Sequence, residues 1–352
     1  MALLTLPGLI DMHVHLRDPG QTWKEDFYTG TAAALAGGFT TVFDMPNNEE
    51  PIISVKRLNR KIKEAKKKIV CDVGFYGGAV GSSFESLKGL EGKVFGPKLY
   101  LNVTTGGFMI DVKKLEQICH IWHARQPILI HAEGRMITGV IDIVKKTSVK
   151  THVCHVSGIE ELKPIIKAKE EGLPLTCGVT PHHLFLNERD LSSLGPYGVM
   201  KPPLKSKKDQ EFLWRNLKYI DVVESDHAPH TRGEKESENP PFGVPGLETT
   251  LPLLLSDKRI TIGDVVRLCY KNPKKILGVK TDRTTKVVVD TNSQFIIHNS
   301  KLHTKCAWSP FHGWKARGKV RRVYIRERKV FEDGKVLVKR GFGKVMFPSF
   351  NP

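Results

Sequence analysis

The sequence predicts an α/β fold: a (β/α)8 TIM-type barrel followed by a small C-terminal β appendage. Short apolar, β-branched runs recur through the first 285 residues, and most are followed by a segment of helical periodicity. Beyond about residue 285 the pattern changes to short alternating segments. Eight strand candidates that alternate with helices favour a closed barrel. An open doubly wound sheet would need a Gly-rich phosphate turn after its first strand, and the sequence has none.

The predicted strands are the apolar runs at residues 6–16, 40–45, 70–76, 97–101, 127–130, 151–156, 173–179 and 221–224. Helical patterns lie between them, as at residues 24–36, 54–69, 112–125 and 159–171. In the second of these, Leu58, Ile62, Ala65 and Ile69 share one face and the basic residues lie opposite. This pattern predicts an amphipathic helix whose basic face is toward solvent.

Short alternating segments follow the barrel at residues 286–289, 294–297, 319–325 and 335–338, and Asp333-Gly334 favours a hairpin turn. We therefore expect two domains. The barrel would cover residues 5–285, and a small β satellite domain would cover residues 286–352 together with the extreme N-terminus.

Composition limits the class of protein. The 352 residues are 40% hydrophobic, and no stretch approaches the roughly 18–20 uninterrupted apolar residues of a membrane span. No basic segment precedes the first apolar residues, so we expect no signal peptide. The six cysteines are scattered without a C-x-x-C pair, which is typical of reduced thiols. We expect a cytoplasmic protein that does not bind membranes.

The net charge of +18 raises the question of nucleic-acid binding. No nucleic-acid reader motif accompanies the charge, and the densest basic run is the solvent face of the predicted helix at 54–69. We therefore expect no nucleic-acid partner. An acidic small-molecule substrate would still benefit from the positive field.

Four histidines and one aspartate lie at predicted strand ends. His13 and His15 alternate along the first strand and so point the same way. His131 ends the fifth predicted strand, His155 the sixth and Asp226 the eighth. Because barrel strands converge at one mouth, and imidazole and carboxylate are zinc ligands, the pattern predicts a metal centre there.

Lys98 lies in the fourth predicted strand, where an ammonium beside divalent cations would be repelled. A lysine suits this place if its charge is removed or reversed. Carbamylation by carbon dioxide would give an anionic carboxylate able to bridge two metals. The residues allow this modification without demanding it, and Lys98 alone would fit a side chain that extends to solvent from a strand end.

Several motifs resemble those of the dihydroorotases in the amidohydrolase superfamily. The run PGLIDMHVHLRDPG at residues 7–20 resembles their N-terminal signature. The others follow in family order: DMPNN at 44–48, KLY at 98–100, IHAE at 130–133, CHV at 154–156, PHHL at 181–184, DHAPHT at 226–231 and GVPGLET at 243–249. The likeness spans nearly the whole chain. It is greatest to the dihydroorotase domain of the animal multifunctional pyrimidine-synthesis protein.

The resemblance implies two zinc ions per chain, bridged by N6-carboxylysine at Lys98 and by a hydroxide. The implied ligands are His13, His15, Lys98 and Asp226 for one ion, and Lys98, His131 and His155 for the other. Asp226 would be the general acid/base that moves a proton between the hydroxide and the ring nitrogen. The implied reaction is the reversible cyclisation of N-carbamoyl-L-aspartate to L-dihydroorotate in de novo pyrimidine biosynthesis.

The resemblance also implies substrate contacts. Arg17 and Asn47 would grip the α-carboxylate with help from His230, since a planar guanidinium binds carboxylates bidentately. Residues 101–111 fit a loop that closes over substrate, with Thr104 or Thr105 in contact with it. The other expected contacts are Lys201, Pro245 and Gly246.

Three positions depart from the animal pattern. In the animal domain, a glutamate after the seventh-strand cysteine helps to bind a third zinc, together with the cysteine that matches Cys154. Here Cys177 is followed by Gly178, which argues against a third metal. Thr105 replaces a phenylalanine, and Lys201 replaces an arginine, so Lys201 would reach an anionic substrate less rigidly.

Two other functions compete with this interpretation. A hydantoinase or allantoinase would share every metal ligand, but Arg17 argues against it because those enzymes bind no substrate carboxylate there. An inactive dihydroorotase-like scaffold for aspartate transcarbamoylase would be expected to lose metal ligands, and all six are present. The resemblance further implies a homodimer and allows aspartate transcarbamoylase as a partner.

Overall fold

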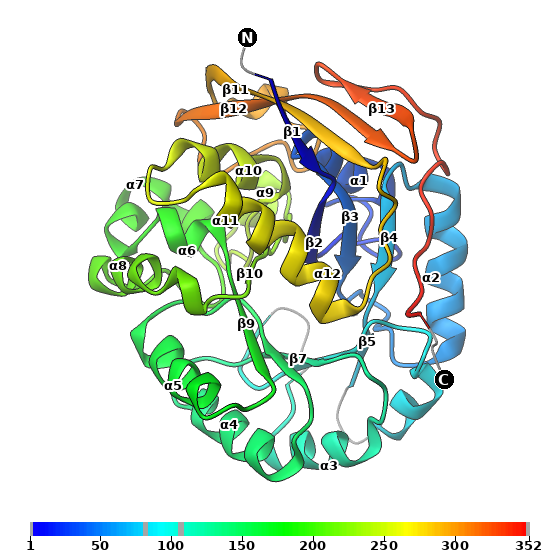
Figure 1. The fold of residues 1–352 in the computed structure, drawn as a ribbon, viewed down its shortest axis with the longest axis vertical. Helices are drawn as coiled ribbons and strands as arrows, with labels where there is room; N and C mark the ends of the chain where they lie inside the picture. Colours follow the sequence, from blue (N-terminus) through cyan, green and yellow to red (C-terminus); the bar gives the residue numbers. More distant parts are fainter. Residues whose placement is uncertain (1–2, 80–83, 105–108, 350–352) are drawn as a thin grey trace.

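Parallel strands close into a barrel in the computed structural model, which describes residues 3–79, 84–104 and 109–349 (Figure 1). The strands are β2 (Leu9–Val14), β3 (Phe39–Asp44), β4 (Asp72–Phe75), β5 (Gly77–Gly78), β6 (Pro97–Tyr100), β7 (Ile128–His131), β8 (Thr151–Val153), β9 (Leu175–Val179) and β10 (Val222–Val223). They occupy eight positions, because β4 and β5 are two parts of one extended segment. The barrel closes where Val14 bridges His227 in parallel and His15 N donates to His227 O at 2.8 Å. The predicted fold class is confirmed.

Helices surround the barrel. The longer ones are α1 (Phe27–Ala36), α2 (Val55–Lys68), α3 (Val112–Ile121), α4 (Met136–Thr147), α5 (Ile159–Glu170), α8 (Lys207–Arg215) and α10 (Leu247–Ser256). The shorter ones are α6 (Pro181–Phe185), α7 (Leu191–Leu194), α9 (Arg232–Lys235), α11 (Ile262–Val266) and α12 (Asn272–Leu277). The helix predicted at 24–36 begins only at Phe27, because the Asp26 carboxylate caps it by accepting from Tyr28 N and Thr29 N, both at 2.9 Å.

Helix α2 buries the predicted face of Leu58, Ile62 and Ala65. One of its basic residues departs from the predicted solvent face. Lys61 is fully buried, and its ammonium donates to Met45 O at 2.9 Å and pairs with Asp44 at 2.8 Å. Its burial is tolerated because the charge is paired and hydrogen-bonded.

A five-stranded antiparallel sheet caps one end of the barrel, with the order β1 (Leu3–Pro7), β11 (Lys286–Ile296), β12 (Lys315–Ile325), β13 (Arg328–Glu332) and β14 (Lys335–Val336). Asp333 and Gly334 have φ angles of 43° and 86°, as the predicted hairpin turn requires. Buried side chains of this sheet, such as Val287 and Val323, share one apolar cluster with barrel residues such as Leu35. A domain boundary at residue 285 stays a prediction.

The C-terminal segment returns to the barrel beside β4. Val73 N donates to Lys344 O at 2.9 Å, and Met346 N donates to Val73 O at 2.8 Å. None of the helices in the described ranges has both the length and the apolar composition that a membrane crossing needs.

Candidate metal centre

Four histidine rings meet at the C-terminal mouth of the barrel. The ring centroids of His13 and His15, at the end of β2, lie 5.3 Å apart. The His155 ring, just after β8, lies 5.1 Å from His13 and 4.7 Å from His131 at the end of β7. All four are buried. Side chains that are far apart in the sequence are thus brought into one cluster.

Asp226 follows β10 and completes this cluster. Its Oδ1 lies 3.3 Å from His13 Nε2 and 3.2 Å from His15 Nε2. Ligand atoms of His13, His155 and Asp226 all lie within 4.8 Å of one another, which is close enough for one cation. The structure therefore brings together the predicted ligands, and their metal-binding roles remain a prediction.

The electrostatics keep the four imidazoles neutral. Burial lowers the pKa of His13 to about 4, and it lowers the pKa of His15, His131 and His155 as well. The positive charge of Lys98 contributes to each of these downward shifts. A neutral imidazole offers a lone pair to a metal, so the site is suited to ligation rather than to ion pairing.

Lys98 lies in β6 and is fully buried. Its Nζ has no hydrogen-bond partner among the described residues and lies 5.0 Å from the centroid of the Tyr100 ring. An unpaired buried ammonium is costly, whereas a carbamate at this place would gain the neighbouring cations as partners. The orphaned amine and the histidine–aspartate donor set therefore fit a pair of zinc-like ions.

Beside the cluster lies a cavity, and four of the predicted substrate contacts line it: Arg17, Asn47, Thr104 and Lys201. Thr105 lies outside the described residues. Lys201 Nζ is 3.9 Å from Glu133 Oε2. The cavity thus combines the predicted metal ligands with two cationic side chains.

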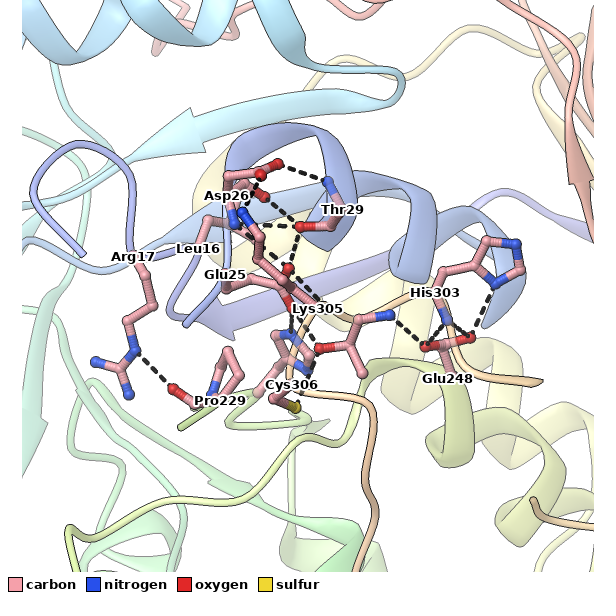
Figure 2. A network of polar contacts seen from close by, with 12 residues as sticks. Leu16, Arg17, Glu25, Asp26, Thr29, Pro229, Glu248, His303, Lys305 and Cys306 are labelled. Carbon is pink, nitrogen blue, oxygen red and sulfur yellow. Dashed lines mark hydrogen bonds and ion pairs between the residues drawn. The ribbon is translucent and has the colours of Figure 1, made fainter. Parts of the chain in front are cut away.

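Arg17 is buried in the wall of this cavity. Its Nε donates to Pro229 O at 3.2 Å (Figure 2), and its Nη2 lies 3.1 Å from His230 Nε2. Within the described part of the chain Arg17 forms no ion pair, and burial lowers its pKa. A buried guanidinium without a carboxylate partner is prepared for an anionic ligand.

Two predicted contacts, Asn47 and His230, also hold neighbouring site residues, and their contact with substrate stays a prediction. Asn47 Oδ1 lies 2.7 Å from His15 Nδ1, so the amide orients that ring. His230 lies behind Arg17, with Nδ1 3.2 Å from Lys24 Nζ and Nε2 2.9 Å from Phe242 O. Both residues fix the groups around the cavity.

Pro245 and Gly246 line a neighbouring hollow rather than the cavity. Gly246 N donates to His227 Nδ1 at 3.2 Å. The cavity wall also contains Phe242 and Gly243, neither of which was among the predicted contacts. A Cβ on Gly243 would lie 2.6 Å from Ala228 O, and this close approach is a signal that only the fold reveals.

Glu133 was part of a quoted motif but had no predicted role. Its Oε1 lies 3.1 Å from His131 Nε2. Residues two apart along a strand have side chains on the same face. This spacing could have predicted from the sequence that Glu133 contacts His131.

Backbone strain is concentrated at the site. Arg17, His155 and Asp226 have φ angles of 60°, 38° and 44°. Such left-handed conformations are uncommon for residues other than glycine and cluster at functional sites. Three predicted site residues share this feature.

Comparisons with known proteins agree with this geometry. The model of the amidohydrolase family matches residues 4–280. The chain is 43% identical over 347 residues to the multifunctional protein CAD of Squalus acanthias, covering 97% of this chain and 16% of that protein. It is 36% identical to the dihydroorotase of Pyrococcus furiosus, covering 95% of this chain and 83% of that protein. The chain thus spans only a small part of the CAD relative and most of the archaeal one.

Solved structures share the fold. An L-hydantoinase from Arthrobacter aurescens superposes with a TM-score of 0.93 at 24% identity, covering 98% of this chain and 89% of that one. The inactive dihydroorotase-like domain of the Chaetomium thermophilum CAD-like protein gives a TM-score of 0.85 at 24% identity, covering 98% and 100%. The chain belongs to the amidohydrolase family and, within it, to the dihydroorotases.

Proposed function

We propose that this chain interconverts N-carbamoyl-L-aspartate and L-dihydroorotate. Arg17 is the observation that carries the proposal: it is a buried guanidinium without an ion pair in the described chain, in the wall of a cavity that also holds the histidine cluster. Both proposed reactants carry a carboxylate, which a guanidinium binds bidentately. The Lys201 ammonium in the same wall adds positive charge.

The proposed cofactors are two zinc ions held by His13, His15, His131, His155, Asp226 and a carboxylated Lys98. When bound, such cations supply Lewis acidity and lower the pKa of water to near ~7. The orphaned Lys98 amine and the neutral imidazoles support this assignment.

Asp226 is the proposed general acid/base. Its carboxylate lies at the cavity beside His13 and His15, and burial raises its pKa, against the opposing effects of His13 and Lys98. A carboxyl group whose pKa is raised toward neutrality can both accept and return a proton. In ring opening it would deliver the proton to the leaving ring nitrogen, and in closure it would remove it.

A two-direction assay tests the proposal. Purified protein loaded with zinc in the presence of bicarbonate should open dihydroorotate and close carbamoyl aspartate, and should act poorly on hydantoin and allantoin. A higher kcat/KM for hydantoin or allantoin would assign the chain to the other cyclic amidohydrolases. No turnover in either direction by a metal-loaded protein would favour the inactive scaffold.

The proposal extends to assembly. By analogy with the relatives we propose a cytoplasmic homodimer, with aspartate transcarbamoylase as a docking partner. Light scattering at micromolar concentration tests the dimer, and a monomer would remove it. Co-elution with added aspartate transcarbamoylase tests the partner, and separate elution at the same concentration would remove that assignment.

A further inference from the structure

One buried ammonium contacts both ends of the segment at residues 44–48, which follows the body of β3. Lys61 of α2 is fully buried, and three oxygens surround its Nζ. The ammonium donates to Met45 O at 2.9 Å and to Asn48 Oδ1 at 2.7 Å, and Asp44 Oδ2 lies 2.8 Å from it. An ammonium has three N–H donors, so these three oxygens match its full hydrogen-bonding capacity.

Two of these partners also bind the loop that carries Arg17. The other carboxylate oxygen of Asp44, Oδ1, accepts Leu16 N at 2.8 Å. The side-chain amide of Asn48 donates to Pro19 O at 3.0 Å. Hydrogen bonds therefore hold the chain on both sides of Arg17. This support matters because Arg17 has a φ of 60°, a backbone conformation that persists only where the surrounding structure imposes it.

Asn47 belongs to the segment that Lys61 contacts. Its Oδ1 lies 2.7 Å from His15 Nδ1. Lys61 is thus connected to the backbone beside both predicted carboxylate contacts, Arg17 and Asn47. Within the described part of the chain Lys61 does not line the cavity, so its effect on a substrate would be indirect. A buried ion pair adds little net stability, because desolvation offsets the attraction, so the role that these contacts indicate is orientation of the two loops.

We propose that Lys61 is a positioning residue for carboxylate recognition, which fixes the loops of Arg17 and Asn47 so that both face one anion. The inference rests on the proposed function, since the anion would be the carboxylate of dihydroorotate or carbamoyl aspartate. A planar guanidinium binds a carboxylate bidentately only in a suitable orientation, so a displaced loop would weaken ground-state and transition-state binding alike. Loss of Lys61 should therefore raise KM more than it lowers kcat.

Lys61→Met in the full, metal-loaded chain tests this inference. Methionine keeps an unbranched side chain and removes the ammonium. We expect kcat/KM for dihydroorotate to fall about tenfold, mainly through KM, with metal content unchanged. In hydrogen–deuterium exchange, peptides that cover residues 14–21 and 44–50 should both exchange faster than in the wild type, because the hydrogen bonds that hold these loops are lost.

Leu58→Ala is the matched control for stability, since Leu58 is a buried apolar residue of the same helix. It should lower the free energy of unfolding and leave KM unchanged. Lys63→Met, at an exposed lysine of α2, controls for the loss of one positive charge. The double variant Lys61→Met with Asp44→Asn removes both charges, so it avoids an unpaired buried carboxylate if the single variant fails to fold. It should show a raised KM as well.

Unchanged exchange in both loops would overturn the inference, and that measurement needs no substrate. Faster exchange with an unchanged KM would also contradict it. An equal rise in KM in Leu58→Ala would assign the effect to lost stability rather than to position. A wild type without turnover would remove the proposed function instead, and the exchange rates would still decide whether Lys61 fixes the two loops.

Discussion

The indole Nε1 of Trp308 donates to the carbonyl oxygen of His230 at 2.7 Å. Trp308 is fully buried in the connection between β11 and β12, and His230 contacts Arg17. The connection between β11 and β12 therefore helps to position the cavity wall. It does so through the hydrogen bond from Trp308 to His230, in the loop behind the Arg17 guanidinium. A sheet remote in sequence from the barrel thus supports the proposed substrate site.

Two glutamates, Glu25 and Glu248, hold this connection in place (Figure 2). Glu248 accepts His303 N at 2.8 Å and Thr304 N at 3.0 Å. Glu25 accepts Lys305 N at 3.2 Å. Each carboxylate accepts backbone N–H groups of the connection, and these hydrogen bonds fix its path over the barrel.

Replacing Trp308 should weaken substrate binding more than chemistry. Trp308→Phe keeps an aromatic ring but removes the donor to His230, which should cost about 0.5–1.5 kcal/mol and loosen the loop behind Arg17. We expect KM for dihydroorotate to rise severalfold, kcat to change less, and metal content to stay the same. Trp314→Phe is the control, because Trp314 is exposed and its ring packs against Phe311. Equal kinetic effects of the two variants would contradict the positioning role.

Loss of the Lys98 amine should abolish turnover. Lys98→Ala removes the only side chain proposed to bridge the two metals, and its Nζ is buried without a hydrogen-bond partner in the described chain. We expect a loss of at least a hundredfold in kcat, with partial rescue by a short carboxylic acid such as propionate. Intact-protein mass spectrometry under bicarbonate should show the carbon dioxide adduct on the wild type.

Lys93→Ala is the matched control for that experiment, since Lys93 is exposed and precedes the same strand. It should retain full activity and the adduct. An unmodified Lys98 in a high-resolution map of a fully metal-loaded protein would exclude the bridging role.

Stability should depend on pH through Lys235. Burial lowers the pKa of Lys235 to about 8, although its Nζ donates to Val199 O and Pro241 O at 2.8 Å. Between about pH 8 and its ordinary value near ~10.4, the unfolded chain binds more protons at this group than the folded one. The contribution of Lys235 to the free energy of unfolding should therefore rise over this window, by up to about 3 kcal/mol.

The measurement is urea unfolding of the wild type and Lys235→Met from pH 7 to 10.5. The difference in unfolding free energy between them should increase with pH, and Lys163→Met, at an exposed lysine, should show no such trend. A difference that stays constant across the window would mean that the pKa of Lys235 is not lowered.

The strand ends could be predicted from sequence because barrel strands carry a strong periodic signal. His13, His15, His131, His155 and Asp226 each follow an apolar run, so their convergence follows from the fold class. The predicted run at 6–16 divides at Gly8 into β1 and β2, which no local pattern shows.

Contacts that depend on packing across the barrel could not be predicted. Lys61 has the helical spacing of a solvent-facing residue, but it is buried because its ammonium pairs with the buried Asp44 carboxylate. His230 lies in a motif next to a metal ligand, and only the path of the loop places it behind Arg17. In the sequence, Glu224 is simply a residue at the end of an apolar strand. Only the fold shows that its carboxylate fills the space beside Gly178. In each case the partner is more than ten residues away and belongs to another element.

The proposed substrate depends most on Arg17, so its removal is the sharpest test. Arg17→Ala should leave both metals bound, because Arg17 is not among the proposed ligands and the histidine cluster has its own supports, such as Asn47 on His15. Losing a charged hydrogen-bond partner in a buried pocket should cost about 2–5 kcal/mol of binding, or more than an order of magnitude in kcat/KM for both dihydroorotate and carbamoyl aspartate. Arg17→Lys should recover part of this lost binding, since an ammonium keeps the charge but cannot bind bidentately.

Hydantoin, which has no carboxylate, should be a poor substrate of the wild type and little affected by either change. Metal content must be measured alongside, because a variant that loses zinc says nothing about carboxylate recognition. If Arg17→Ala keeps both metals and full dihydroorotate activity, the substrate carboxylate is bound elsewhere, and Lys201 becomes the cation to test next.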